Sequence, residues 1–275
     1  MEHNKLPLLV EPEQLLPVLQ NPDLLIIDLC KPETYSQGHV PGAVHVDYSQ
    51  IIAAQRPVMG LVPDAEHLTR LMSSLGATPN THIVTYDDEG GGRAARFLYT
   101  LDIMQHSRYS LLNGGIHAWA NEGHPLETTS NTKPTTDYTV TLQQQPVATK
   151  GYILEHLDND AVALIDARSP AEYCGEKKFA EKGGHIPGAV NIDWINLIDQ
   201  QHNMRLKPAD EIKRLLAQYR ITTDHVDQPM VVYCQTHHRS ALTYIALKLL
   251  GFSNVKGYPG SWSEWGNSTD TPVES

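Results

Sequence analysis

A cysteine and an arginine separated by four residues carry the strongest chemical signal in the sequence. Cys234 follows the apolar run 230–233, and Arg239 precedes a segment with apolar residues at helical spacing that ends at Gly251. The pattern predicts a strand, a short polar loop and a helix. Amides at a helix start lack partners within the helix, so a loop curled around the sulfur would direct several N–H donors at it. Together with the charge of Arg239, they should lower the pKa of the thiol below its free value of about 8.5, which makes Cys234 a candidate nucleophile.

Two histidines beside this cysteine raise the alternative of a metal site. His237 and His238 could join Cys234 around zinc, because thiolate and imidazole are good zinc ligands. Adjacent histidines on a tight loop point in different directions, however, and no second Cys or His pair stands nearby in the sequence. A bound metal would also quench the nucleophile. We therefore expect no metal, and we expect the histidines to act as loop donors or anion contacts, or to lie in solvent.

The composition limits the classes of partner. Acidic residues outnumber basic ones by 32 to 21 and the net charge is -11, which argues against a broad nucleic-acid or membrane surface. Three cysteines do not form a disulfide framework and suit a reducing compartment. We expect Cys30 to be buried and Cys174 to be exposed. No signal-peptide pattern and no stretch of membrane-spanning length is present, which predicts a cytoplasmic protein with no nucleic-acid or membrane partner.

An internal repeat determines how these residues must be positioned. Residues 24–47 match residues 163–193, and the two copies share GHVPGAV and GHIPGAV. In both copies short apolar runs alternate with helical patterns, which is typical of a mostly parallel sheet with helices on both faces. The polar segment 126–146 separates the copies and is expected to be a linker. We therefore predict two α/β domains, residues 1–125 and 147–275.

Only the second copy carries the cysteine. In the first copy the corresponding turn reads DDEGGGRA, with Asp87 in the position of Cys234. A carboxylate cannot act as a sulfur nucleophile, and the neighbouring acids Asp88 and Glu89 would repel an anionic substrate. The first domain is therefore predicted to be inactive. Asp28 and Asp166 follow equivalent strands in the two copies, which indicates a structural role in tying the loop that follows.

The two-copy layout, the stretch GHIPGAVNID and the stretch VVYCQTHHRSA resemble the tandem-domain rhodanese family of sulfurtransferases, and the loop CQTHHRS resembles that of a bacterial branch of thiosulfate sulfurtransferases. The resemblance covers nearly the whole chain. It implies two rhodanese-like domains and a catalytic Cys234 that cycles through a persulfide without any cofactor. It also implies a set of substrate-binding residues: Gln235, Thr236, His237, His238, Arg239 and Arg168.

The implied reaction moves the outer sulfur of thiosulfate to cyanide or to a thiol. The partners are then a small-molecule donor and acceptor, with no nucleic acid or membrane. Two alternatives stay open: a 3-mercaptopyruvate sulfurtransferase, and a persulfide carrier that delivers sulfur to a partner protein. Glu172 stands where many two-domain relatives have a substrate-facing arginine, and it should repel the carboxylate of mercaptopyruvate. The loop length argues against a phosphatase, since phosphatases with a similar loop have five residues between Cys and Arg and this chain has four.

Overall fold

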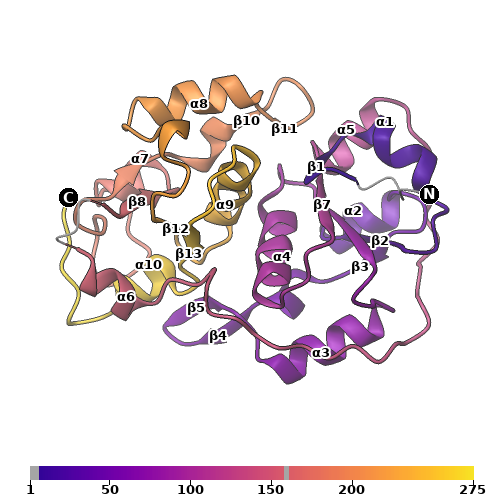
Figure 1. Cartoon of the computed structure of the whole chain (residues 1–275), viewed down its shortest axis with the longest axis horizontal. Helices are drawn as coiled ribbons and strands as arrows, with labels where there is room; N and C mark the ends of the chain where they lie inside the picture. Colours follow the sequence, from indigo (N-terminus) through magenta and orange to yellow (C-terminus); the bar gives the residue numbers. More distant parts are fainter. Residues whose placement is uncertain (1–5, 158–160) are drawn as a thin grey trace. The chain divides into compact units, whose positions relative to one another are not determined.

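The chain forms two compact units. The computed structural model describes residues 6–157 and 161–275 (Figure 1). Unit 1 comprises Met1–Ile51, Pro63–Gln143 and Asp199–Leu206, and unit 2 comprises Ile52–Val62, Gln144–Ile198 and Lys207–Ser275. Each unit thus contains a short segment from the opposite half of the sequence. The predicted domain boundaries at residues 125 and 147 stay a prediction.

Unit 1 is built on a five-stranded sheet with the strand order β1-β7-β6-β2-β3, in which every neighbouring pair is parallel. Its central strands β2 and β6 are buried along their whole length, as a parallel sheet requires. The strands are β1 (Leu9–Val10), β2 (Leu24–Asp28), β3 (Val44–His45), β6 (His82–Tyr86) and β7 (Tyr109–Leu112). The helices are α1 (Pro12–Leu15), α2 (Pro32–Gln37), α3 (Ala65–Ser74), α4 (Gly92–Ile103) and α5 (Gly115–Asn121), with 3-10 turns η1 (Leu16–Val18) and η2 (Tyr48–Ile51).

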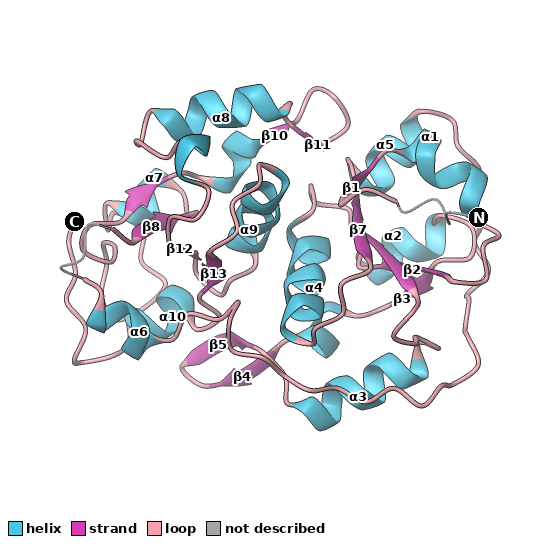
Figure 2. Ribbon diagram, viewed as in Figure 1, coloured by secondary structure: helices cyan, strands magenta, loops and turns pink. Residues whose placement is uncertain are grey.

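Unit 2 is built on a four-stranded parallel sheet with the order β13-β12-β8-β9, and it also contains an antiparallel hairpin, β4–β5 (Figure 2). The sheet strands are β8 (Ala163–Asp166), β9 (Val190–Asn191), β12 (Met230–Tyr233) and β13 (Val255–Gly257), and the hairpin strands are β4 (Ala53–Gln55) and β5 (Val58–Leu61). The helices are α6 (Lys150–Glu155), α7 (Pro170–Tyr173), α8 (Ala209–Ala217), α9 (Arg239–Leu249) and α10 (Ser261–Trp265), with 3-10 turns η3 (Trp194–Leu197) and η4 (Thr223–His225). Two further short strands, β10 (Ile198–Asp199) and β11 (Arg205–Leu206), form a separate two-stranded sheet, and the segment Asp199–Leu206 belongs to unit 1.

The elements expected around the cysteine are present. The apolar run 230–233 is the buried strand β12, and α9 ends just before Gly251, whose φ of +92° suits a glycine after a helix. The α8 helix places Ile212 and Leu216 one turn apart on its buried side. Two mixed α/β repeats with mostly parallel sheets confirm the predicted fold class.

The polar segment that was expected to be a linker packs along unit 1. It has no helix or strand within residues 128–143, but its backbone is held by hydrogen bonds from Thr136 to Ser73 and from Gln143 to Ile103. Tyr138 is buried, so the segment adds to the core of unit 1. Among the described residues, no helix is both long and apolar enough to cross a bilayer.

Matching turns in the two copies have the geometry that their Pro-Gly sequences indicate. Gly42 and Gly188 have φ angles of +80° and +76°, values that favour glycine over other residues. A Cβ atom added at either glycine would meet no heavy atom within 4 Å. Backbone conformation, rather than lack of space, therefore explains glycine at these two turns.

Candidate active site

Cys234 lies where β12 ends and the loop to α9 begins. The strand pairs with β8 on one side and β13 on the other, which places Tyr233 opposite Asp166. The backbone of Cys234 is fixed by the start of α10: its N–H donates to Ser261 Oγ at 3.3 Å, and its carbonyl accepts from the N–H of Trp262 at 3.0 Å. The next carbonyl, of Gln235, accepts from the N–H of Ser263 at 2.9 Å. Cys234 itself is completely buried in unit 2.

The surroundings of the sulfur favour its ionised form. Burial alone would raise the pKa of the Cys234 thiol. The positive charge of Arg239 opposes this effect, as do hydrogen bonds from the hydroxyl and amide of Ser240 and from the amide of Thr236, and together they lower the pKa below its usual value. The direction agrees with the prediction, although the Ser240 hydroxyl was not foreseen as a donor.

His237 contacts Ser240 in the buried interior of unit 2. Its Nδ1 atom lies 2.7 Å from Ser240 Oγ, and both residues are fully buried. The hydroxyl has one proton, so a serine that donates to the sulfur must accept a hydrogen bond from an Nδ1–H of His237. His237 has a φ of +52°, in the left-handed region, which turns its ring toward the first turn of α9. The expectation that His237 contacts the anion directly therefore becomes one of orienting Ser240.

Arg239 is clamped by a carboxylate. Its Nη1 and Nη2 atoms donate to the two oxygens of Glu172 at 2.7 and 2.8 Å. Burial would raise the pKa of Glu172, but Arg239 and the Ser169 hydrogen bonds lower it to about 2. Burial likewise opposes the charge of Arg239, while Glu172 and Cys234 raise its pKa. Both groups are charged, so Arg239 balances the negative charge of Glu172 that was expected to repel a substrate.

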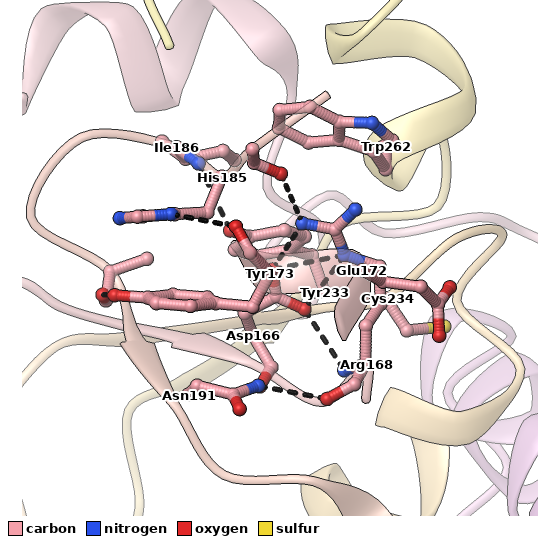
Figure 3. Close-up of polar contacts among 12 residues, drawn as sticks. Asp166, Arg168, Glu172, Tyr173, His185, Ile186, Asn191, Tyr233, Cys234 and Trp262 are labelled. Carbon is pink, nitrogen blue, oxygen red and sulfur yellow. Dashed lines mark hydrogen bonds and ion pairs between the residues drawn. The ribbon is translucent and has the colours of Figure 1, made fainter. Parts of the chain in front are cut away.

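Arg168 lies in a separate buried network (Figure 3). Its guanidinium donates to both carboxylate oxygens of Asp166, with the shortest contact at 2.5 Å, and to the carbonyl of Gly184 at 2.7 Å. It also lies 4.3 Å from the centre of the Trp262 ring. Because Trp262 holds the Cys234 carbonyl, Arg168 supports the strand end beneath the loop. None of these hydrogen bonds involves a residue of the loop 234–239.

The remaining loop residues lie partly buried at the edge of the site. Gln235 Nε2 donates to the carbonyl of Phe179 at 3.2 Å, which ties the loop to the segment between α7 and β9. His238 lies near Trp194, with their ring centroids 6.5 Å apart. The backbone amide of Thr236 donates a hydrogen bond to the sulfur of Cys234. The structure thus brings Thr236, Arg239 and the unforeseen Ser240 to the sulfur.

The other two cysteines differ from Cys234 as expected. Cys30 is buried, and burial together with the charges of Asp28 and Asp87 raises the pKa of its thiol strongly. Cys174 is exposed. Within residues 6–157 and 161–275, one group of side chains has the spacing of metal ligands, namely Glu13, Glu122 and His124 in unit 1, and it includes neither Cys234 nor the loop histidines.

The equivalent turn in unit 1 is filled by its own side chain. Asp87 accepts hydrogen bonds through Oδ1 from the amides of Glu89 and Gly91, at 3.0 and 2.8 Å, and through Oδ2 from the amide of Ala94 at 2.9 Å. Burial raises the pKa of Asp87, the charge of Glu89 adds to this, and the three amides oppose it. The turn therefore keeps its amide donors in both copies, with a carboxylate as the acceptor in unit 1.

Ser240 and Ser261 are the site residues that the sequence interpretation missed. Ser240 follows Arg239 directly, so a hydroxyl in the first turn of the helix was the available signal. Ser261 is 27 residues beyond Cys234, and its hydroxyl also donates to the Tyr258 carbonyl at 2.7 Å. Nothing local in the sequence links Ser261 to the loop, because the contact depends on how β13 and α10 return to β12.

Comparison with known proteins agrees with this fold. A family model described as the rhodanese-like domain matches residues 11–122 and 149–268. The chain therefore belongs to the rhodanese family and contains two copies of its domain. It is 45% identical to a thiosulfate sulfurtransferase of Azotobacter vinelandii, over 98% of this chain and 97% of that protein. It is 42% identical to a thiosulfate sulfurtransferase of Pseudomonas aeruginosa, with the same coverage.

Among solved structures, the chain is similar to SseA from Escherichia coli, whose crystal structure is described with the rhodanese fold and catalytic mechanism of 3-mercaptopyruvate sulfotransferases. The TM-score is 0.82 at 26% sequence identity, over 93% of this chain and 98% of that one. The predicted membership of a tandem-domain rhodanese family is confirmed.

Proposed function

We propose that the protein is a thiosulfate sulfurtransferase that transfers the outer sulfur of thiosulfate to cyanide or to a thiol through a persulfide on Cys234. The stabilised thiolate of Cys234, in a chain similar over its whole length to thiosulfate sulfurtransferases, carries the proposal. Residues 147–275 would form the catalytic domain and residues 1–125 an inactive one. The Asp87 carboxylate, held by three amides, supports the second assignment.

Two displacements complete the reaction. The Cys234 thiolate attacks the outer sulfur of thiosulfate, a new S–S bond forms, and the original S–S bond breaks with its electron pair leaving on sulfite. The acceptor then attacks the terminal sulfur of the persulfide, so that cyanide becomes thiocyanate and the thiolate is released. Both steps are heterolytic and balance in atoms and electrons without a cofactor. A covalent intermediate between two half-reactions implies ping-pong kinetics.

The loop residues stabilise the charge on sulfur through these steps. The amides of Thr236 and Ser240 donate to the sulfur, and the Ser240 hydroxyl, oriented by His237, adds a third donor. Charge-assisted bonds of this kind are the stronger hydrogen bonds in proteins. Arg239 supplies a positive charge whose position is fixed by Glu172. We propose Gln235 and His238 as contacts to the donor, and Arg168 as a support beneath the loop.

The choice of donor follows from the shape of the amide cradle, by which we mean the backbone amides of Thr236 and Ser240 that converge on the Cys234 sulfur. Thiosulfate is a compact dianion that suits converging amides beside one arginine, whereas 3-mercaptopyruvate needs separate donors for its carboxylate and its carbonyl. The acceptor is a small nucleophile in this proposal. A protein thiol can accept the sulfur by the same attack, and the rate at which cyanide alone discharges the persulfide separates an enzyme from a carrier.

Mass spectrometry tests the proposal. Incubation with thiosulfate should add the mass of one sulfur atom to the intact protein, peptide spectra should place it on Cys234, and cyanide should remove it. Cys234→Ser should take up no sulfur. Absence of an adduct, or an adduct on Cys30 or Cys174, would contradict the assignment.

A further inference from the structure

The β4–β5 hairpin contacts the elements that carry the catalytic loop. It comes from the first half of the sequence, but it belongs to unit 2. The N–H of Met59 donates to Ser263 Oγ at 2.9 Å, and the Met59 carbonyl lies 3.1 Å from the same hydroxyl. The amide of Ser263 in turn donates to the carbonyl of Gln235 at 2.9 Å. A short chain of hydrogen bonds therefore runs from β5 through α10 to the loop after Cys234.

Gly60 approaches the loop directly. Its φ is +73°, and a Cβ atom added there would lie 2.8 Å from both the carbonyl carbon and the Cβ of Thr236, and closer still to the carbonyl oxygen of Thr236. Real Cβ atoms essentially never come so near to another backbone, so this position has no room for a side chain. The hairpin backbone thus packs against Thr236, the residue whose amide donates to Cys234.

Three contacts share the task of holding the loop. The start of α10 fixes the carbonyls of Cys234 and Gln235, and the bond between His237 and Ser240 fixes the other end. Thr236 lies between these two anchored ends, where the hairpin makes its close approach. A loop that aims amides at one atom depends on backbone placement to within about 0.5 Å. Because Thr236 is the middle residue of the loop, the contact that the hairpin makes with it has the largest effect on where the loop amides point.

We propose that the β4–β5 hairpin is a positioning element of the catalytic loop, and that Gly60, by its close approach to Thr236, holds the Thr236 amide toward the sulfur of Cys234. The inference rests on the proposed function, because it assigns the group that sets the geometry of the same site. Gly60 itself touches neither donor nor sulfur. It acts through the peptide backbone of Thr236.

Gly60→Ala tests the proposal through the ionisation of the thiol. Thiolate absorbance is followed against pH in a Cys174→Ser background, and the Cys234→Ser protein supplies the baseline. A methyl group at residue 60 must displace Thr236, so we expect the pKa of Cys234 to rise by about one unit, the effect of losing one hydrogen bond to a charged group. Persulfide formation from thiosulfate at a pH below that pKa should slow up to about tenfold, in proportion to the thiolate.

Gly188→Ala is the matched control. It lies in the same unit and has nearly the same φ, +76°, but an added Cβ meets no atom within 4 Å. Gly188→Ala therefore places alanine at a similar positive φ, as Gly60→Ala does, but causes no clash with Thr236. It should leave the pKa of Cys234 unchanged. A folded Gly60→Ala protein with the titration of the parent protein would overturn the proposal, and so would an equal shift in Gly188→Ala.

Ser263→Ala decides the matter if Gly60→Ala does not fold. It removes the hydroxyl that joins Met59 to α10 and adds no clash. We expect it to raise the pKa of Cys234 in the same direction, and an unchanged titration in this variant would refute a positioning role for the hairpin. The titration uses no sulfur donor. Failure of the parent protein to form a persulfide from thiosulfate would therefore count against the proposed function, not against the role of the hairpin.

Discussion

Replacing Glu172 by glutamine should make Cys234 more reactive and the fold less stable. Glu172 accepts both N–H groups of Arg239 at 2.7 and 2.8 Å, and its charge offsets that of the arginine beside the sulfur. Glutamine keeps one acceptor oxygen and removes the charge. Arg239 would then act with its full positive charge on the thiolate and on an incoming dianion. We expect a lower pKa for Cys234 and a lower KM for thiosulfate.

The pKa of Glu172 sets the size of the stability effect. It is about 2 in the folded protein against an ordinary value of 4.5. At about 1.4 kcal/mol per pKa unit, the ionised carboxylate contributes about 3 kcal/mol to the free energy of unfolding at neutral pH. Because the folded pKa is the lower one, this contribution is complete above 4.5 and is lost as the pH falls toward 2. Glutamine retains part of the hydrogen bonding, so we expect a loss of about 1–3 kcal/mol at pH 7 that shrinks in acid.

The effect on the sulfur should be about one pKa unit downward, as for the loss of a like charge near an ionisable group. Thiolate absorbance, steady-state kinetics with thiosulfate, and urea unfolding at pH 7 and pH 3 measure the three effects. Glu176→Gln, at an exposed position four residues along the chain, changes the net charge equally and serves as the control. A higher KM for thiosulfate in Glu172→Gln would show that Glu172 acts mainly by orienting Arg239, and our charge argument would be wrong.

Two further predictions concern the donor and the inactive copy. Side-by-side kinetics with cyanide as acceptor should give a higher kcat/KM for thiosulfate than for 3-mercaptopyruvate, because the amide cradle offers converging amides and no separate carboxylate site. A preference for mercaptopyruvate would overturn the donor assignment but not the role of Cys234. The double variant Asp87→Cys, Cys234→Ser should show no thiosulfate turnover, since Arg93 is already paired with Asp88 and Glu89 at 3.4 and 3.3 Å. Measurable turnover in that variant would show that the amides alone are sufficient.

The fold could be predicted from the sequence where the signal is local. The buried strand β12, the helix α9 and the amphipathic helix α8 each follow from residue spacing, and the repeat extends that prediction to two α/β units. The hairpin β4–β5 shows the limit of such prediction. Its residues belong to the first half of the sequence, but they lie in unit 2. Its packing depends on contacts with residues about 200 positions away, such as Met59 with Ser263, and no local pattern encodes them.

The site was partly predictable for the same reason. Cys234 and Arg239 stand out because strand, loop and helix are continuous in sequence, and the lower thiol pKa follows from that arrangement. The partner of Arg239 could not be read from spacing, because Glu172 is 67 residues away and reaches it only in the folded unit. Arg168 matched a family position, whereas its side chain is used to bind Asp166 and Gly184. A motif thus indicates which residues lie near a site, and the fold determines what each side chain contacts.

The two copies together explain why the proposed chemistry resides in one of them. Both turns present backbone amides to the residue that ends the strand: the amides of Glu89, Gly91 and Ala94 to Asp87, and those of Thr236 and Ser240 to Cys234. A turn of this kind stabilises whichever anion ends the strand. With a carboxyl group, its oxygens occupy the donors and no sulfur can be loaded. With a thiolate the same donors hold a nucleophile whose charge can move to a second sulfur atom and back. The residue that ends the strand, together with the acids around the arginine of the turn, therefore separates a structural turn from a site that can carry sulfur, and both turns use backbone amides as donors.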